Sequence, residues 1–173
     1  MEDVKSNIAE KKEAAGSPGT WRSRMENMKP VLIMLVEDDE GDQKLTKISL
    51  AQEKVANEIC LVESGEDALD YLARCKAGAP ENPIPDLILL DLNMPGMGGK
   101  EFLKRLKRDD DFRGIPVVVL TTSDSDQDIL ESYDLQAAGY IKKPVTLDGF
   151  RAAMREVGEY WFVVCRRMAR RCA

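Results

Sequence analysis

The sequence contains no histidine among its 173 residues. This absence excludes a Ser–His–Asp triad, a histidine general base and a phosphohistidine carrier, because each of them needs an imidazole ring. The few cysteines are scattered without a CxxC spacing, so we expect reduced thiols rather than a zinc site. They are Cys60, Cys75, Cys165 and Cys172. If the protein carries a phosphoryl group, it carries it on another residue type.

Long apolar runs and an excess of positive charge are also missing. Runs such as Val31–Val36 and Leu87–Leu90 are too short to cross a bilayer, and the charged first residues contain no signal-peptide core. We therefore expect a cytoplasmic protein without a membrane partner. The net charge of -6 offers no broad basic face to a phosphate backbone, so DNA is not an expected partner.

The composition that remains is typical of a folded domain. Hydrophobic residues make up 43% of the chain and charged residues 32%, and the length allows one domain with a buried core. Residues 1–29 are rich in Lys, Glu, Ser and Gly and show little apolar periodicity, which predicts a flexible extension. We expect the domain at residues 30–160 and a C-terminal helix extension at residues 161–173.

From Val31 onward, the chain repeats an apolar strand followed by a helix five times. The expected strands are Val31–Val36, Glu58–Val62, Asp86–Leu90, Ile115–Leu120 and Tyr140–Ile141. The expected helices are Gly41–Glu53, one capped by Ser64, Gly99–Arg108, residues 124–138 and one capped by Thr146. This alternation predicts an α/β fold, a doubly wound five-stranded parallel sheet in the order 2-1-3-4-5.

The apolar positions of these helices indicate the faces that should contact the sheet. They are Leu45, Ile48 and Ala51 or Gln52 in the first helix, Ala68, Leu69, Tyr71 and Leu72 in the second, and Phe102, Leu103 and Leu106 in the third. We interpret Asp39, Glu40 and Asp42 as solvated acids that favour the dipole at the start of the first helix. In the terminal helix, Trp161–Cys165 is apolar nearly all round, which predicts an association surface for a partner or a homodimer.

Polar residues follow the expected strands at one edge of the predicted sheet. They are Glu37-Asp38-Asp39-Glu40, Asp91, Thr121-Thr122 and Lys142-Lys143-Pro144. The first and third strands are neighbours in the expected order, so Glu37, Asp38 and Asp91 should converge at the switch point. Two unit charges about 4 Å apart repel by roughly 4 kcal/mol at an effective dielectric near 20. The pocket therefore needs a cation or a shared proton.

Oxygen ligands with room for water suit Mg²⁺, and the backbone carbonyl of Asn93 could be a further ligand. Thr121 adds a hydroxyl donor and Lys143 adds a positive charge. Together with a carboxylate nucleophile, these groups are suited to the transfer of a phosphoryl group.

The ordered motifs resemble the receiver domains of two-component signalling over about residues 31–157. They are Val36-Glu37-Asp38, Leu90-Asp91-Leu92-Asn93-Met94-Pro95-Gly96, Leu120-Thr121 and Lys143-Pro144. The resemblance implies the flavodoxin-like receiver fold and a switch that catalyses its own phosphotransfer and slow dephosphorylation, rather than an enzyme. It also implies a sensor histidine kinase as phosphodonor and a downstream protein target or phosphotransfer protein.

The resemblance further implies a role for each site residue. Asp91 would be the phosphoacceptor, with Thr121 contacting the phosphoryl oxygens and Lys143 pairing with them. Tyr140 would be the aromatic residue that changes rotamer on activation. The implied Mg²⁺ ligands are Glu37 through water, Asp38, Asp91 and the carbonyl of Asn93.

A closer resemblance is to the single-domain regulators that are paired with bacterial phytochromes. It is carried by Val36–Asp42, Asn57-Glu58, Thr121-Thr122-Ser123-Asp124 and Tyr160-Trp161-Phe162. It implies a phytochrome-type kinase as the partner. Thr122 departs from the general receiver pattern, in which a smaller Ala, Gly or Ser is usual at this position, and this predicts narrower access for the phosphodonor and slower turnover.

Two alternative functions stay open at this point. A haloacid-dehalogenase-like phosphatase also uses a strand-end aspartate and Mg²⁺, although Asp91-Leu92-Asn93-Met94-Pro95 lacks the second Asp and the Thr of its DxDxT motif. A receiver-like scaffold that never takes up phosphate is the other. The complete acidic pocket, with Thr121 and Lys143, argues against a degenerate scaffold.

Overall fold

The computed structural model describes residues 30–51, 57–121 and 135–143, with residues 148, 149, 152, 153 and 155. Strands and helices alternate from residue 31 to residue 121, as the sequence predicts. The elements are β1 (Val31–Val36), α3 (Glu40–Ala51), β2 (Asn57–Val62), α4 (Gly65–Lys76), β3 (Leu87–Asp91), α5 (Gly99–Leu106), β4 (Val117–Thr121) and β5 (Gly139–Lys142).

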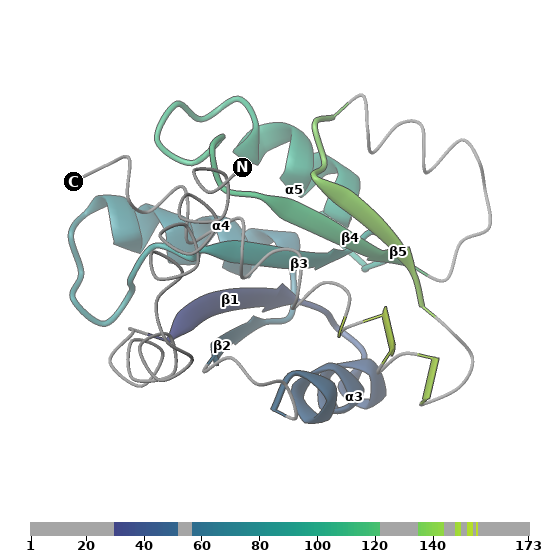
Figure 1. The fold of residues 1–173 in the computed structure, drawn as a ribbon. Coiled ribbons are helices and arrows are strands. Elements are labelled where there is room, and N and C mark those ends of the chain that lie inside the picture. Colours follow the sequence, from purple (N-terminus) through teal and green to yellow (C-terminus); the bar gives the residue numbers. More distant parts are fainter. Residues whose placement is uncertain are drawn as a thin grey trace, which may run out of the picture.

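The five strands form one parallel sheet in the order β2-β1-β3-β4-β5, which confirms the predicted fold class (Figure 1). The direction in which strands are added reverses between β1 and β3. The chain places β2 on one side of β1 and then returns to place β3 on the other side of β1. Val36 pairs with Leu90 at this reversal. The ends of β1 and β3 therefore lie side by side at the carboxyl edge of the sheet.

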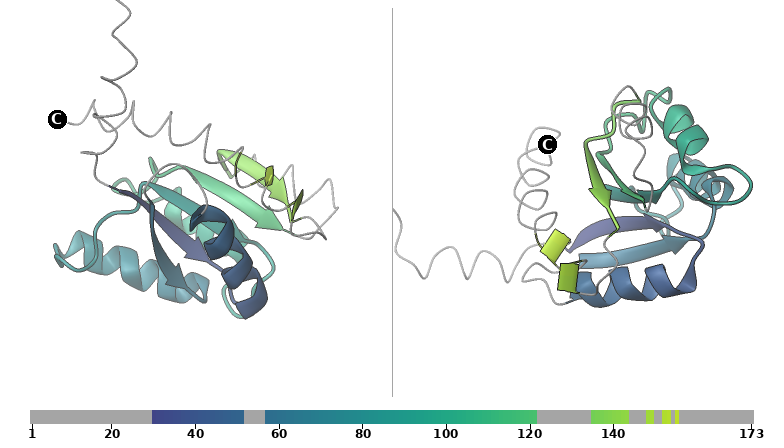
Figure 2. Two further views of the ribbon diagram at one scale, coloured as in Figure 1. Left: turned by 60° about the horizontal axis from the view of Figure 1, so that its bottom comes forward. Right: turned by 90° about the vertical axis from the view of Figure 1, so that its right-hand side faces the viewer.

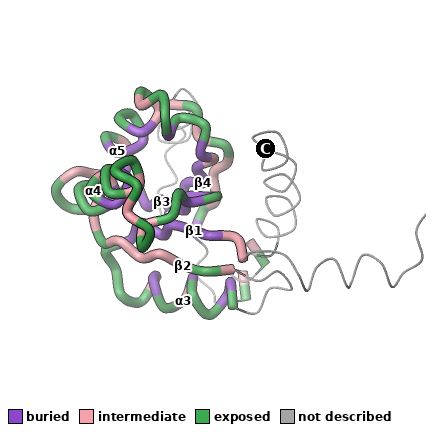
Figure 3. Tube along the Cα trace, turned by 90° about the vertical axis from the view of Figure 1, so that its left-hand side faces the viewer, coloured by how far each residue is buried: buried purple, intermediate pink, exposed green. Residues whose placement is uncertain are grey.

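Helices lie on both faces of the sheet, and the side chains of each strand point alternately to one face and to the other. Met34 and Val36 of β1 pack on the face that α4 and α5 cover, while Ile33 and Leu35 pack on the α3 face (Figures 1 and 2). All five residues of β3 are buried, and the same holds for β4. Figure 3 shows this buried centre with exposed residues on the outer sides of the helices.

The predicted contact face of the first helix is confirmed at Leu45, which packs half-buried against the core, but it was wrong at Ile48 and Ala51. Ile48 is 40% exposed and Ala51 is also exposed, whereas the buried residues of α3 include the polar Gln43, Thr46 and Ser49. Gln43 is tolerated there because its amide donates to a backbone carbonyl. Its Nε2 atom lies 2.9 Å from the carbonyl oxygen of Glu37. Helix α3 thus contacts the sheet through the apolar Leu45 and Leu50 and also through polar side chains, which hydrophobic periodicity does not detect.

The predicted contact faces of α4 and α5 are confirmed. Ala68, Tyr71 and Leu72 are buried in α4, and Leu69 packs half-buried against the same core. The apolar face of α5 is buried in full, through Phe102, Leu103 and Leu106.

Ser64 caps α4 as predicted. Its hydroxyl accepts a hydrogen bond from the backbone N–H of Asp67 over 3.0 Å. This bond satisfies one of the backbone donors that have no partner inside the first turn of a helix.

Three strands end one residue later than the sequence predicted. Asp91, Thr121 and Lys142 are the last residues of β3, β4 and β5 instead of the first residues after them. Their backbones still pair with neighbouring strands, Asp91 with Leu120 and Thr121 with Lys142. A polar side chain at the end of a strand does not interrupt backbone pairing, so the polar residue is a poor marker of the boundary.

Several predictions concern residues outside the described ranges. They are the extension at residues 1–29, most of the helix at residues 124–138, Thr122, the association surface Trp161–Cys165 and the extension at residues 161–173. Residues 135–138 of that helix are described and are not helical, so the predicted end of the helix was wrong. Among the described residues, no helix is both long enough and apolar enough to cross a membrane.

Candidate functional site

The carboxyl edge of the sheet brings together residues from four strand ends. Glu37 follows β1, Asp91 ends β3, Thr121 ends β4 and Lys143 follows β5. The backbone N–H of Lys143 donates to the carbonyl of Thr121 over 2.8 Å, which continues the pairing of β5 with β4 beyond the last strand residue. All four residues are buried. The structure therefore gathers the residues that the sequence placed at this edge.

The Lys143 ammonium lies among three carboxylates. Its Nζ atom is 2.6 Å from Glu37 Oε2, 2.7 Å from Asp42 Oδ2 and 2.8 Å from Asp91 Oδ2. The contacts with Glu37 and Asp91 agree with the site predicted from the sequence. The contact with Asp42 does not, because that residue was interpreted as a solvated acid of the helix start. An ammonium has three protons, so each of them has a carboxylate acceptor here.

Burial raises the pKa of Glu37 to about 7, although the hydrogen bond and the charge of Lys143 act in the opposite direction. For Lys143, burial by itself would lower the pKa. Its hydrogen bonds to Asp42, Asp91 and Glu37 outweigh that effect and raise the pKa above its ordinary value. The ammonium therefore stays charged at neutral pH. One lysine cannot balance all of the surrounding carboxylates, which favours an additional cation.

The cluster of Glu37, Asp38 and Asp91 fits a divalent metal ion. Their carboxylate oxygens lie within 4.8 Å of one another. Mg²⁺ holds its ligands at 2.0–2.1 Å, so two oxygens on one ion are at most about 4.2 Å apart. A spacing within 4.8 Å is compatible with direct ligands and also with a carboxylate that reaches the ion through water. Glu37 suits that role because its oxygens already accept hydrogen bonds from Lys143 and from the backbone N–H of Asp39.

Asn93 lies in the loop after β3 and forms hydrogen bonds with Asp91 and Thr121. Its backbone N–H donates to Asp91 Oδ1 over 3.0 Å, and its side-chain amide donates to Thr121 Oγ1 over 3.1 Å. The loop therefore orients the Asp91 carboxylate and holds the Thr121 hydroxyl. Sequence reasoning included Asn93 for its carbonyl, and it missed this side-chain bond to β4.

A glycine and a glutamate shape the rest of that loop. Gly96 has a φ of +73°, which a residue with a Cβ rarely adopts. The Glu66 carboxylate of α4 accepts a hydrogen bond from the backbone N–H of Met97 over 2.9 Å. Glu66 lies 31 residues away in sequence, so it gave no local signal of this role.

Tyr140 lies in β5 and is half-buried against the core on the α4 and α5 side of the sheet. Its neighbour two residues on, Lys142, is exposed, whereas Lys143 is buried. The two lysines that are adjacent in sequence thus differ in burial, and Lys143 lies among the carboxylates of the site.

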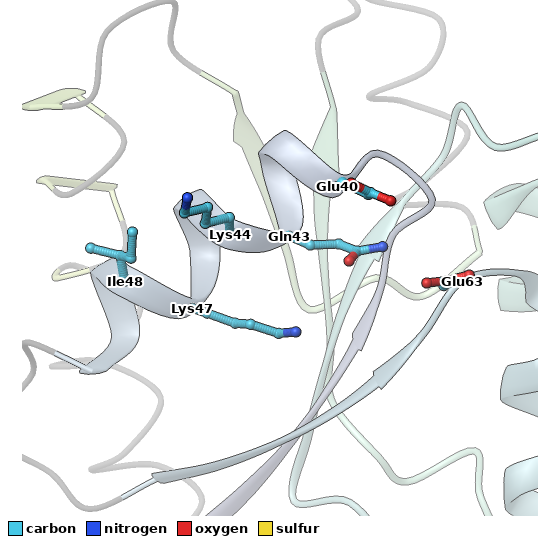
Figure 4. Close-up of a pocket in the computed structure, with 6 residues that line it drawn as sticks. All are labelled: Glu40, Gln43, Lys44, Lys47, Ile48 and Glu63. Atoms are coloured by element: carbon cyan, nitrogen blue, oxygen red, sulfur yellow. The ribbon is translucent and has the colours of Figure 1, made fainter.

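A pocket of about 390 Å³ lies along α3 (Figure 4). Five of its lining residues belong to α3 and the sixth follows β2. They are Glu40, Gln43, Lys44, Lys47, Ile48 and Glu63. The cluster carboxylates of Glu37, Asp38 and Asp91 do not line this pocket. The pocket along α3 is therefore separate from the site predicted at the strand ends.

Comparison with known proteins identifies the family. The family model for the response regulator receiver domain matches residues 33–155. The response regulator Rcp1 of Synechocystis sp. is 36% identical over 137 residues, which are 79% of this chain and 92% of that protein.

Solved structures of response regulators also resemble this chain. The Mn²⁺-bound form of Rcp1 has a TM-score of 0.70 at 34% identity, covering 76% of this chain and 94% of its own. The phosphorylated cyanobacterial phytochrome response regulator RcpA has a TM-score of 0.71 at 39% identity, covering 78% and 95%. The bacteriophytochrome response regulator RtBRR has a TM-score of 0.62 at 40% identity, covering 75% and 79%.

These comparisons give no support to the phosphatase alternative. The family match covers well over half of the chain, and the sheet order is that of the receiver fold. The chain therefore belongs to the response regulator receiver domain family, whose members are the signalling switches of two-component systems and act with histidine kinases.

Proposed function

We propose that this receiver accepts a phosphoryl group on Asp91 from a sensor histidine kinase and passes the signal on through a changed protein interface. The contact between Lys143 Nζ and Asp91 Oδ2, 2.8 Å long and buried, carries this proposal. It holds a fixed positive charge beside the one carboxylate that ends the central strand β3. Buried preorganised charge of this kind stabilises the negative charge that develops during phosphoryl transfer.

Mg²⁺ is the proposed cofactor. Asp38, Asp91 and the backbone carbonyl of Asn93 would hold it, with Glu37 acting through a water molecule. Once bound, the ion would offset negative charge on the phosphoryl oxygens and on the cluster. The spacing of the carboxylate oxygens supports this assignment, and the Mn²⁺-bound form of Rcp1 is a relative with a divalent metal.

In the proposed transfer, a carboxylate oxygen of Asp91 forms a bond to phosphorus while the phosphorus–nitrogen bond of the kinase phosphohistidine breaks. The electron pair of that bond stays on the imidazole nitrogen, and Asp91 becomes an acyl phosphate. Lys143 pairs with the incoming phosphoryl oxygens and Thr121 donates a hydrogen bond to them. Both residues thus act on the group that carries the charge.

The proposed switch follows from the added charge of about -1.5 to -2. To reach a phosphoryl oxygen, Thr121 gives up its hydrogen bond from Asn93. Tyr140, half-buried on the neighbouring strand β5, then changes its rotamer and alters the surface beside β4 and β5. A downstream protein target or a phosphotransfer protein would bind that surface.

A phytochrome-type histidine kinase is the proposed input. RcpA is described as a cyanobacterial phytochrome response regulator and RtBRR as a bacteriophytochrome response regulator, and both resemble this chain along most of its length. Because such kinases take phosphate from ATP, we place the exchange in the cytoplasm. Transfer of labelled phosphate from the phytochrome-type kinase of the same organism, within seconds and faster than from unrelated kinases, is the expected result. Equal rates from all kinases would contradict this partner.

The acceptor is tested with acetyl phosphate and Mg²⁺, followed by mass spectrometry of the intact protein. A single phosphoryl adduct that hydroxylamine removes is expected, since acyl phosphates react with hydroxylamine and phosphate esters do not. Asp91→Asn should show no adduct, whereas Asp110→Asn, an exposed acid outside the site, should behave like the unaltered protein. An adduct that persists in Asp91→Asn would overturn the assignment.

We also propose that the protein does not turn over external substrates. With an excess of a generic phosphate ester and Mg²⁺, product should stay below one equivalent per protein molecule. Multiple turnovers that depend on Asp91 would instead show an enzyme.

A further inference from the structure

Asp42 contacts the ammonium at the centre of the site. Its Oδ2 atom lies 2.7 Å from Lys143 Nζ, a distance between those of Glu37 and Asp91. The two residues are 101 positions apart in sequence. An acid that only favours a helix dipole needs no such partner, so the dipole does not account for this contact.

The start of α3 directs Asp42 to this position. Asp39 caps the helix, because its Oδ1 atom accepts a hydrogen bond from the backbone N–H of Asp42 over 2.9 Å. The carbonyl of Asp39 accepts a second bond from the backbone N–H of Gln43 over 2.9 Å. The Gln43 side chain in turn bonds to the backbone of Glu37. The first turn is thus tied to the end of β1, which sets the place from which Asp42 reaches Lys143.

The three carboxylates differ in how easily they can release the ammonium. The side chains of Glu37 and Asp91 are 1% and 9% exposed, whereas that of Asp42 is 34% exposed. A buried carboxylate that loses its partner remains uncompensated in a medium of low polarity, which costs several kcal/mol. Asp42 can turn toward water at much lower cost. It is therefore the acceptor that Lys143 can most readily exchange.

We propose that Asp42 is a positioning residue that competes with the phosphoryl group for Lys143. In the unphosphorylated protein its carboxylate accepts one of the three hydrogen bonds of the ammonium, and it gives up that bond when phosphoryl oxygens arrive. The competition lowers the affinity of the site for the phosphoryl group. This inference rests on the proposed phosphorylation of Asp91.

The test measures the affinity of the Mg²⁺-loaded protein for fluoroberyllate, which mimics a phosphoryl group on an aspartate. Asp42→Asn keeps the shape of the side chain and removes its charge. We expect it to bind fluoroberyllate about fivefold more tightly, the size expected for loss of one competing ion pair at a partly exposed site. Thermal unfolding of each variant without ligand separates this effect from a change in stability.

Two further variants make the result specific. Glu40→Gln removes the same charge from the same helical turn, but Glu40 is not one of the three acceptors of the Lys143 ammonium. The affinity of this variant for fluoroberyllate should therefore change less than twofold. Asp42→Glu keeps a carboxylate at this partly exposed position, and it should retain most of the original affinity.

Equal affinities for Asp42→Asn and Glu40→Gln would overturn the inference, because the effect would then be one of general charge. An Asp42→Glu variant that behaves like Asp42→Asn would also overturn it. Failure of the proposed function is distinguishable, since in that case the unaltered protein binds no fluoroberyllate and forms no adduct on Asp91. Both proposals would then fall together.

Discussion

The side-chain amide of Asn93 donates a hydrogen bond to Thr121 Oγ1 over 3.1 Å, and it thereby joins the loop after β3 to the end of β4. Asn93 also donates its backbone N–H to Asp91. One loop residue therefore contacts both the proposed phosphoacceptor and the proposed switch hydroxyl. These two hydrogen bonds form a short path between Asp91 and Thr121.

Thr121→Val should weaken fluoroberyllate binding by about tenfold, because a hydrogen bond to a charged group contributes about 1.5 kcal/mol or more. Thr121→Ser keeps the hydroxyl and should stay within about threefold of the unaltered protein, with affinity measured by calorimetric titration. Unchanged binding in Thr121→Val would show that the hydroxyl does not contact the bound group.

Mg²⁺ should stabilise the fold, because it binds the native cluster and finds no such cluster in the unfolded chain. At 100 times its Kd, the ion should raise the free energy of unfolding by about 2.7 kcal/mol. The Asp38→Asn variant should lose most of this stabilisation by Mg²⁺. Because Asp38 is exposed, the free energy of unfolding of the variant without metal should not fall. Urea unfolding with and without Mg²⁺ measures both quantities.

Glu40→Gln serves as the control for Asp38→Asn, because it removes one nearby negative charge from a residue outside the cluster. It should keep nearly all of the stabilisation by Mg²⁺. If the two variants lose the gain equally, the cluster does not bind the ion as assigned.

Lys143→Met should lower the free energy of unfolding by about 3 kcal/mol in the absence of metal. The substitution leaves Glu37 and Asp91 buried without a positive partner, and removing one member of a buried ion pair typically has this cost. Lys142→Met at the exposed neighbouring position should change stability by no more than about 0.5 kcal/mol. Denaturant titration of both variants checks the difference, and equal stabilities would show that the buried ion pairs contribute little.

Gly99→Ala should lower the free energy of unfolding by about 3 kcal/mol or more. A Cβ atom at this position would overlap with the backbone oxygen of Asp91 and would lie 2.8 Å from Leu92 Cα. These are backbone atoms that cannot move aside cheaply, so the loop after β3 must distort. Gly114→Ala, where a Cβ meets nothing within 4 Å, is the control and should be nearly neutral by thermal unfolding. A Gly99→Ala protein as stable as Gly114→Ala would contradict this account.

The architecture and most of the site could be predicted because they depend on local pattern and one topological rule. Continuous apolar strands such as Val31–Val36 can only lie in a sheet that is covered on both faces. Parallel strands end at a common edge, so the polar residues after them, including Asp91 and Lys143, had to come together there.

The tertiary structure alone decided which of the acidic residues near β1 contact Lys143. In sequence, Asp42 looks like the other acids of the helix start, Asp39 and Glu40, and nothing local distinguishes it. It meets Lys143 only because the start of α3 and the end of β5 are held against the same edge of the sheet. The buried polar face of α3 has a similar cause. Gln43 can be buried because a carbonyl of the folded chain lies within reach. Periodicity records how often apolar residues recur, whereas a hydrogen bond or ion pair depends on the distance between two atoms, which is set only when the elements pack.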